Sequence, residues 1–515
     1  MSRKSIFIAF VVSLGGFLFG FDAAIISGAQ EFFGPYFGFS GDQIASINAA
    51  PTFAAMFSML IAGLISDKIG RKKVLIAVAF VYALSAFLSA YAISYWVLWW
   101  ARFIGGAAFG AALILAPMYI AEVSTAKNRG KLVSVQQLNI VIGLSVAYFT
   151  GYFLQQSISD VAQVSENLTK QNVWRWMFGL ELIPAVIYFF LLFFVPKSPR
   201  WLYVKGRDVE AFEVLKKLHG NNKATEEEEL IKESFKENSK KEKITISKMF
   251  KKSLRFVLFL GLFIGIIQMI TGINAIFFYS TSIFKQSGIG TNAAFASSVL
   301  VGVINIVFTI LAMILIDRMG RRPLMLIGLI GAAIGMFLTS YGFSKATYKL
   351  TKEDVSNIQG VDSSKFNKVE NILFENDVEF KRALKELLGE QIFADRQGEI
   401  IEAAGDLDAI LILIGILTFV ASFAFSLGPV MWVLLSELFP NRVRSLMIAF
   451  VGFVNSCTSW VVQRTFNWEI DTLGSSTSYF IFGALALVGF VVLLKYLPET
   501  KGKSLEQIEK ELVKA

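Results

Sequence analysis

Two charged side chains lie inside long apolar stretches of this sequence, where an isolated charge is costly. Asp22 lies in the apolar run 6–29 and Arg102 in the run 96–121. If both runs are membrane-crossing helices of opposite direction, each charge lies in the outer part of the membrane, roughly 24 Å and roughly 9 Å from the starts of the runs. We therefore expect an interior pair whose carboxylate can accept a proton. A static structural pair and a hydrated aspartate near the interface are the alternatives.

Uncharged amides and one tryptophan form a second set of polar side chains within the apolar runs. The run 256–283 is the most polar of them, and single amides recur in other runs. Amides match hydroxyl groups because each one offers both a donor and an acceptor, and an indole can cover the apolar face of a pyranose. We therefore expect a polyhydroxylated neutral ligand, with amides that only join helices as the alternative. The candidate ligand-binding residues are Gln137, Gln268, Asn274, Asn305, Trp432 and Asn455.

A short charged turn occurs twice, at Asp67–Lys73 and Asp317–Arg322, with the same order of aspartate, glycine and basic residues. These turns are 250 residues apart, whereas a second repeated pattern, a glutamate seven residues before an arginine, recurs at an offset of 315 (Glu122 and Arg129, then Glu437 and Arg444). The offsets differ by 65, which is the length of the polar segment 344–408. The sequence therefore predicts two homologous halves, as in many secondary transporters, with an insertion in the second.

The elements that must position these residues are helices that cross a membrane. The chain of 515 residues is 55% hydrophobic and only 17% charged, and a soluble protein has little use for many helices that are apolar on all sides. Runs of about 20 apolar residues are long enough to span the hydrocarbon core. We therefore predict an all-α membrane protein with twelve transmembrane helices, at about 6–29, 45–65, 74–93, 96–121, 131–154, 176–195, 256–283, 293–316, 323–343, 410–438, 445–464 and 477–497.

The charge pattern indicates which ends of these helices face the cytoplasm. Basic turns follow every second span, and the polar segment 197–255 falls on the same side, so both termini are expected to be cytoplasmic. The first run lacks a small-residue cleavage site, which favours a retained span over a signal peptide. The sequence thus predicts a multi-pass protein of the plasma or inner membrane. Its expected parts are a six-helix half 1–196, a cytoplasmic helical linker 197–255, a second six-helix half 256–497 with an outward-facing insertion 344–408, and a cytoplasmic tail 498–515.

The two polar segments carry helical patterns of their own. In the linker, Val209, Phe212, Leu215 and Leu218 recur on one helical face that Gly220 can end. In the insertion, apolar residues recur at helical spacing and end at Gly389. We therefore expect surface helices in the linker, with a disordered linker as the alternative, and a partly helical cap in the insertion.

Several classes of function are disfavoured by what the sequence lacks. The net charge of +9 is explained by the turns on one side of the membrane and is not a nucleic-acid signal. The single cysteine, Cys457, excludes an internal disulfide. No metal-ligand cluster, phosphate-binding glycine loop or nucleophile–base arrangement is evident. We expect no enzyme activity, metal, cofactor or nucleic-acid partner.

Taken together, the motifs resemble those of the sugar porter family of the major facilitator superfamily, and they cover the whole chain except the insertion. The similarity is greatest to bacterial proton–sugar symporters and animal glucose facilitators. The matching signatures are Asp67–Lys73, Asp317–Arg322, Arg102–Gly106, Pro117–Glu122, Pro196–Arg200, Gln268–Asn274, Gly428–Trp432 and Pro498–Gly502.

This resemblance implies two pseudo-symmetric six-helix halves that alternate access to a monosaccharide site between them. It assigns sugar contacts to the six candidate residues named above. It also makes Asp22 the proton-linked acid, with Arg102 as its partner, and the proton the coupling ion. The charges that it implies close the cytoplasmic side are Asp67, Arg71, Glu122, Arg129, Asp317, Arg321, Glu437 and Arg444.

Three residues depart from the family pattern. Met269 replaces the second of two glutamines, Phe278 replaces the first tyrosine of a pair, and Lys197 replaces a glutamate. The sequence thus favours a proton-coupled hexose or pentose importer, monomeric and surrounded by lipid, without naming the sugar. A facilitator in which Asp22 is only structural is the main alternative. A membrane sugar sensor is less favoured, because the tail after Gly502 has only 13 residues.

Overall fold

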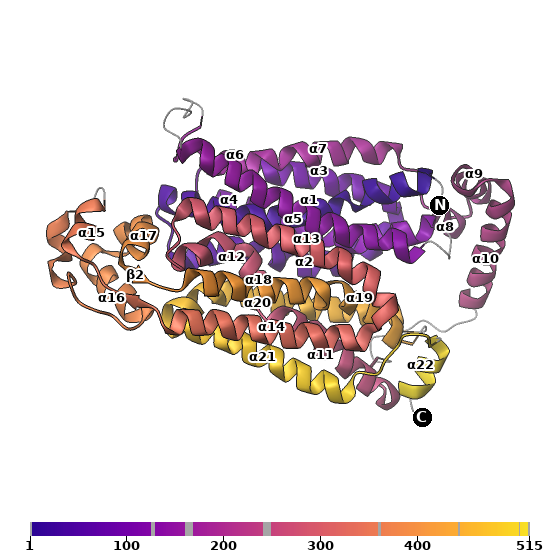
Figure 1. Cartoon of the computed structure of the whole chain (residues 1–515). Coiled ribbons are helices and arrows are strands. Elements are labelled where there is room, and N and C mark those ends of the chain that lie inside the picture. The colour runs from indigo at the N-terminus through magenta and orange to yellow at the C-terminus, as the bar shows by residue number, and fades with distance from the viewer. Residues whose placement is uncertain are drawn as a thin grey trace.

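The computed structural model describes residues 3–124, 129–159, 168–239, 249–358, 362–440, 443–503 and 505–512. Twelve stretches of helix in these residues are long and apolar enough to cross a membrane, which confirms the predicted fold class. The helices lie side by side in one elongated bundle (Figure 1). The first six spans are α1 (Arg3–Phe37), α2 (Gly41–Ile69), α3 (Arg71–Ala90), α4 (Tyr95–Val123), α5 (Arg129–Ser159) and the pair α6 (Val173–Leu180) and α7 (Leu182–Leu191).

The second six spans repeat this arrangement. They are the pair α11 (Arg255–Ile270) and α12 (Ile273–Gln286), α13 (Thr291–Met319), α14 (Arg321–Ser344), the pair α18 (Ala409–Phe425) and α19 (Leu427–Leu438), α20 (Arg444–Leu473) and α21 (Ser475–Tyr496). In the first half α1 packs on α5 and α2 on α4, and in the second half α11 packs on α20 and α13 on α18 in the equivalent way. The halves are therefore pseudo-symmetric in packing as well as in sequence.

Two spans of the second half are interrupted near the middle of the bundle. Between α11 and α12, Gly272 adopts a left-handed conformation with φ of 94°, which glycine tolerates at little cost. Between α18 and α19, Ser426 leaves the helical conformation, and Pro429 follows in the first turn of α19. Such breaks free backbone carbonyls that need partners within the protein, and amide side chains supply them.

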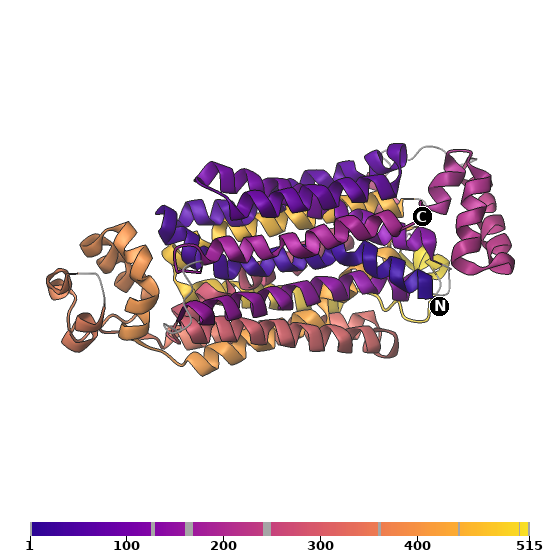
Figure 2. The same ribbon diagram turned by 90° about the horizontal axis from the view of Figure 1, so that it is seen from above.

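One end of the bundle carries the short helices after the first half and, in Figures 1 and 2, both termini. We call it the linker end. Its helices are α8 (Pro199–Val204), α9 (Asp208–His219), α10 (Asn221–Ser239) and α22 (Leu505–Leu512), with short 3-10 turns at Leu192–Phe194 and Lys252–Leu254. Leu215 and Leu218 are buried and Gly220 ends α9 as expected, but Val209 is 82% exposed. Val209 differs in exposure from Leu215 and Leu218 because it lies in the first turn of α9, away from the small apolar core around Leu202, Tyr203 and Leu215.

The opposite end carries residues 344–408 as a separate small lobe, and we call it the insertion end (Figure 2). The lobe contains α15 (Lys352–Asn357), a 3-10 segment (Ser363–Lys368), α16 (Asp377–Leu388) and α17 (Glu390–Ala404). Two short strands, β1 (Thr347–Tyr348) and β2 (Gly405–Asp406), pair antiparallel where the lobe joins the bundle. Its apolar residues form a core of their own, which includes Tyr348, Phe366, Phe380 and Leu384.

The two halves meet most closely toward the insertion end. The largest apolar core is continuous there from Phe33 and Trp174 of the first half to Tyr279 and Phe466 of the second. A separate core, around Tyr82 and Tyr119, belongs to the first half alone. The described residues thus show a bundle whose halves are closed together at the insertion end.

Candidate functional site

The structure brings Asp22 of α1 and Arg102 of α4 together inside the first half. A guanidinium nitrogen of Arg102, Nη1, donates to Oδ1 of Asp22 in an ion pair. Arg102 is 2% exposed and Asp22 8%, so both charges are removed from water and depend on one another. The guanidinium also lies over the Phe178 ring, with 5.6 Å between its central carbon and the ring centroid.

Glycines allow the close helix contacts that place this pair. A Cβ added at Gly20 would lie 1.9 Å from the carbonyl oxygen of Ile140 in α5, and one added at Gly106 would lie 2.1 Å from that of Pro51 in α2. Neither distance is possible for a larger residue without a backbone shift. Gly20 lies two residues before Asp22, and Gly106 lies four residues after Arg102. The glycines therefore set the separation of the helices from which the two charges project.

A further acidic side chain, Glu181, lies close enough to interact electrostatically with both members of the pair. It occupies the junction between α6 and α7 and is 3% exposed. Within the described part of the chain, Nε and Nη2 of Arg102 have no hydrogen-bond partner. Arg102 thus lies within electrostatic range of two carboxyl groups and is hydrogen-bonded to one of them. Glu181 is not among the residues predicted from the sequence, although a glutamate inside the predicted span 176–195 is a visible signal.

The polar residues near the two helix breaks are hydrogen-bonded to one another. Gln268 Nε2 donates to the carbonyl oxygen of Leu427, in the first residue after the α18–α19 break, at 2.9 Å. Asn455 Nδ2 donates to Gln268 Oε1 at 2.9 Å and to the carbonyl oxygen of Gly265 at 2.7 Å. Amides thus satisfy backbone groups near the breaks, and in this conformation Gln268 and Asn455 join helices.

Asn274 forms hydrogen bonds with a different set of partners. It is half-buried in the first turn of α12. Its amide nitrogen donates to Oγ of Ser459 in α20 and to the sulfur of Met269 at 3.5 Å. Met269 is one of the three departures from the family pattern named above.

The remaining sequence-predicted ligand residues lie outside this hydrogen-bonded cluster as far as the structure describes it. Asn305 is buried in α13 and accepts from the Thr309 hydroxyl at 3.5 Å. Gln137 is half-buried in α5. Trp432, in α19 just after Pro429, is 39% exposed.

At the linker end, the first repeated turn folds into an ion-pair network within the first half. Arg71 pairs with Asp67 at 2.7 Å and with Glu122 of α4 at 3.1 Å. Its Nη1 also donates to the carbonyl oxygen of Ser66, and the Ser198 hydroxyl donates to the second oxygen of Glu122. The turn, α4 and the start of α8 are thereby tied together.

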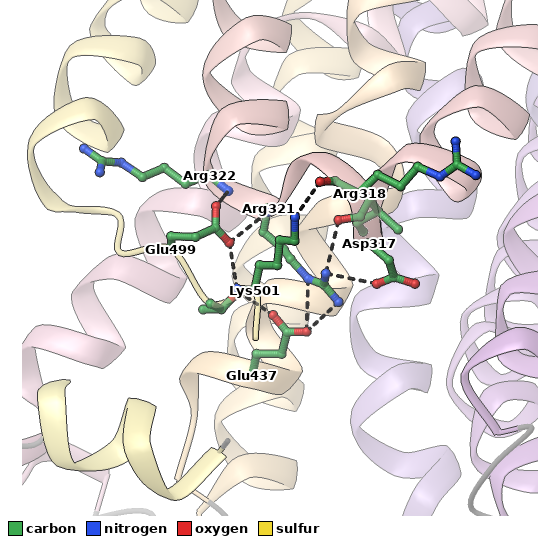
Figure 3. Close-up of polar contacts among 9 residues, drawn as sticks. Asp317, Arg318, Arg321, Arg322, Glu437, Glu499 and Lys501 are labelled. Atoms are coloured by element: carbon green, nitrogen blue, oxygen red, sulfur yellow. Dashed lines mark hydrogen bonds and ion pairs between the residues drawn. The ribbon is translucent and has the colours of Figure 1, made fainter. Parts of the chain in front are cut away.

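The second repeated turn forms the same network in the second half (Figure 3). Arg321 pairs with Asp317 and with Glu437 of α19, both at 3.0 Å. Thr500, the counterpart of Ser198, donates to Glu437 at 2.6 Å. Glu499 accepts from the backbone N–H groups of Arg321 and Arg322 at the start of α14, both at 3.1 Å.

The remaining members of the predicted cytoplasmic network have other surroundings. The side chain of Arg129 lies outside the described residues, and Arg444 Nε donates to the carbonyl oxygen of Phe439 at 3.0 Å. Lys197, at the position that corresponds to Glu499, points to Glu210 of α9 at 2.9 Å instead of capping α3. The ion pairs described for Arg71 therefore join only residues of the first half, and those described for Arg321 join only residues of the second half.

Most side-chain bonds between described residues of the two halves lie toward the insertion end, and Ser456 of α20 also donates to the sulfur of Met59 of α2 at 3.6 Å. Lys285 of α12 pairs with Glu31 of α1 at 2.6 Å, and Arg464 of α20 pairs with Asp42 of α2 at 2.6 Å. Tyr148 of α5 donates to the carbonyl oxygen of Phe277 at 2.8 Å. Further hydrogen bonds join Ser27 to Thr281, Gln30 to Ser282, Thr52 to Gln463 and Asn467 to Gly41.

Comparisons with known proteins agree with this arrangement. A family model described as sugar (and other) transporter matches residues 8–361 and 397–512, so it omits the centre of the insertion. The chain is 31% identical to the arabinose-proton symporter of Bacillus subtilis, over 99% of this chain and 95% of that protein. It is also 31% identical to the D-xylose-proton symporter of Escherichia coli strain K12, over 98% and 94% of the two chains.

Solved structures show the same fold. A partially occluded inward open conformation of the xylose transporter XylE from E. coli matches with a TM-score of 0.74 and 29% identity, over 98% of this chain and 100% of that one. The proton:xylose symporter XylE bound to 6-bromo-6-deoxy-D-glucose matches with a TM-score of 0.70 and 29% identity, over 99% and 100% of the two chains.

Proposed function

Because this chain belongs to the sugar (and other) transporter family of the major facilitator superfamily, we propose that it imports a hexose or pentose together with protons by alternating access. As a family member it is a multi-pass membrane transporter and not an enzyme. The observation that carries the coupling proposal is the buried pair of Asp22 and Arg102, with Glu181 as a second carboxylate within electrostatic reach.

The charge count of this cluster supports a role for the proton. With both carboxylates ionised the three groups sum to one negative charge, which is costly away from water. One proton on Asp22 would neutralise the cluster and release Arg102, whose unpartnered nitrogens leave it able to turn to Glu181. Protonation would thus change how α1, α4 and the α6–α7 junction are held together, and this is the kind of two-state element that a gradient can bias.

The sugar is proposed to bind between the halves at Gln137, Gln268, Asn274, Asn305, Trp432 and Asn455. Amide groups near the two helix breaks and the partly exposed indole of Trp432 support this assignment. The symporters of arabinose and xylose among the relatives support a monosaccharide of that size. The substitutions Met269 and Phe278 leave this site less polar than the family pattern, which favours a sugar with fewer hydroxyl contacts there.

The remaining parts of the proposal concern motion and placement. The halves 1–196 and 256–497 would rock as units joined by the linker 197–255, with the insertion 344–408 outside and both termini and the tail 498–515 cytoplasmic. With that orientation, closure at the insertion end makes this conformation inward-facing. The two arginine networks and their neighbours Arg129 and Arg444 would close the cytoplasmic side in the opposite conformation. We expect a monomer in lipid, with no resident cofactor.

Proton uptake in purified vesicles tests this function. Proteoliposomes containing the protein should show alkalinisation of the outer medium when xylose or arabinose is added, and should concentrate that sugar when the outside is acidified. Vesicles with the Arg102→Ala protein serve as the control, because the carboxylate then lacks its partner. Sugar equilibration without proton movement would replace this proposal with a facilitator in which Asp22 is structural.

A further inference from the structure

A chain of three hydrogen bonds runs from the proposed sugar site across the contact between the halves. Asn274 Nδ2 donates to Ser459 Oγ, and Gln463 Nε2 donates to the same oxygen at 2.9 Å. The other end of the Gln463 amide, Oε1, accepts from the Thr52 hydroxyl of α2 at 3.1 Å. Asn274, Ser459 and Gln463 belong to the second half and Thr52 to the first, so the last bond exists only while the halves are closed at the insertion end.

Gln463 is held firmly in this chain. Its side chain is 0% exposed, and Thr52 and Ser459 are 6% and 4% exposed. Its own carbonyl oxygen accepts from the Tyr279 hydroxyl at 3.1 Å, which fixes the backbone from which the side chain projects. A buried amide that lost Thr52 would have an unsatisfied acceptor, which is costly. Contact with Thr52 therefore fixes the orientation of Gln463, and through it the rotamer of Ser459.

The consequence lies at Asn274. An amide nitrogen has two hydrogens to donate, and in this conformation its partners are Ser459 and the sulfur of Met269. The nitrogen has no donor to spare for a sugar hydroxyl, and only the amide oxygen is left to accept. When the halves separate at the insertion end, Thr52 leaves, Gln463 is no longer anchored, and Ser459 is free to turn away from Asn274.

We propose that Gln463 is a positioning residue that makes the hydrogen-bonding capacity of Asn274 depend on contact between the halves. Closure at the insertion end withdraws the Asn274 donor from the sugar and lowers the affinity in the conformation that releases it. This inference rests on the proposed sugar site, and it adds a residue, Gln463, that touches no sugar itself. Thr52 makes the effect depend on closure, because it is the one residue of this hydrogen-bonded chain that belongs to the first half.

The test requires a protein locked in the closed form. The hydroxyl oxygens of Ser27 and Thr281 are 3.1 Å apart across the halves, so cysteines at both positions, in a Cys457→Ser background, can form a disulfide that holds the insertion end closed. The affinity for D-xylose and for arabinose is measured by titration in the oxidised and in the reduced protein. The ratio of the two affinities measures how strongly closure weakens binding.

We expect closure to weaken binding about tenfold in the locked parent, the effect of about one hydrogen bond. Gln463→Met and Thr52→Val should bring the ratio close to one by raising the affinity of the oxidised form, and Thr52→Ser, which keeps the hydroxyl, should restore it. Tyr148→Phe is the matched control, since it removes another bond between the halves that does not lead to Asn274. It should leave the ratio unchanged.

Two results are decisive against parts of this account. The first is a ratio of oxidised to reduced affinity that is the same in the parent, Gln463→Met and Thr52→Val proteins. A change of that ratio in Tyr148→Phe as large as in Gln463→Met would have the same meaning. Either outcome would show that Gln463 only joins helices, without affecting the proposal that the protein binds sugar. Absence of sugar binding to the reduced parent would instead overturn the proposed function on which the inference rests.

Discussion

Arg102 is hydrogen-bonded to Asp22 and lies within electrostatic range of Glu181, and all three side chains are buried. A charge buried in this way is retained only when its partners compensate it. With both carboxylates ionised the three groups sum to minus one, and a single proton is then the smallest change that balances the site. In a hydrated site, water would compensate each of these charges. A proton could then bind or leave without changing how the helices are held together.

The amides of the proposed sugar site differ in how much structure each supports, and this gives a prediction. Gln268→Ala leaves the carbonyl oxygen of Leu427 and the buried Asn455 short of partners, so we expect lower thermal stability as well as weaker sugar binding. Asn274→Ala affects a half-buried side chain and should weaken binding by on the order of 1–3 kcal/mol with little change in melting temperature.

Titration of both variants with xylose or arabinose, alongside melting curves without sugar, separates the two effects. Unchanged affinity in both variants would assign these amides to helix packing alone.

At the scale of elements, each repeated turn is tied to a short segment outside its own bundle helices. We predict that Arg71→Ala or Arg321→Ala shifts the population toward the conformation that is open at the linker end, because the two arginine networks are proposed to close that end in the opposite conformation. Labelling of a cysteine placed in the proposed cytoplasmic cavity should become faster.

Arg318→Ala is the matched control for this prediction, since Arg318 lies on the same turn as Arg321 but is exposed. Slower labelling in the two network variants, or equal labelling in all three, would contradict the gating role.

Asp377 helps to fix the insertion to the second half, as does the ion pair between Lys385 and Asp471 at 3.1 Å. Asp377 Oδ2 accepts from the backbone N–H and hydroxyl of Ser475 at 3.2 and 2.8 Å, and pairs with Lys381 at 3.2 Å. Burial alone would raise the pKa of Asp377, but the charge of Lys381 and the hydrogen bonds from Ser475 outweigh it and lower that pKa below its ordinary value. The contact is therefore present at neutral pH and is lost as the pH falls through the lowered pKa.

We accordingly predict that Asp377→Asn loosens the start of α16 at neutral pH. Hydrogen exchange of residues 377–388 should become faster in the variant, while exchange in the membrane-spanning helices stays the same. Asp354→Asn is the control, because Asp354 caps α15 within the lobe and makes no such anchor. Unchanged exchange in Asp377→Asn would assign the anchoring to the remaining contacts.

Much of this architecture was predictable from sequence because it depends on local signals. The length and apolarity of the runs predicted all twelve spans, and the two offsets predicted the repeat. The exposure of Val209 could not be predicted, since its spacing suited a buried face but no core lies beside it. Glu181 and Gln463 were missed for a different reason. Their partners come from other helices, so only the folded chain brings Glu181 near Arg102 or Gln463 against Thr52.

At the scale of the whole molecule, two halves of equivalent packing are closed against each other at the insertion end and hold separate ion-pair networks at the linker end. Moving from this conformation to one that is closed at the linker end requires that the bonds between the halves be replaced by others at a low net cost in free energy. The polar contacts at the insertion end meet this requirement. When the halves separate, the same amides and hydroxyls can form hydrogen bonds with water instead of with each other. The proposed proton-binding cluster lies within the first half, so it can act only through the shape of that half.

The central claim is that a proton on Asp22 drives the accumulation of sugar, and Asp22→Asn tests it most directly. Asparagine is nearly isosteric but binds no proton, so Arg102 is released at every pH and no step of the cycle depends on the gradient. In proteoliposomes with an acidic exterior, we predict that the variant still binds sugar and exchanges it down a gradient, but neither concentrates it nor alkalinises the outer medium. An Asp22→Asn protein that concentrates sugar as the wild type does would contradict the account.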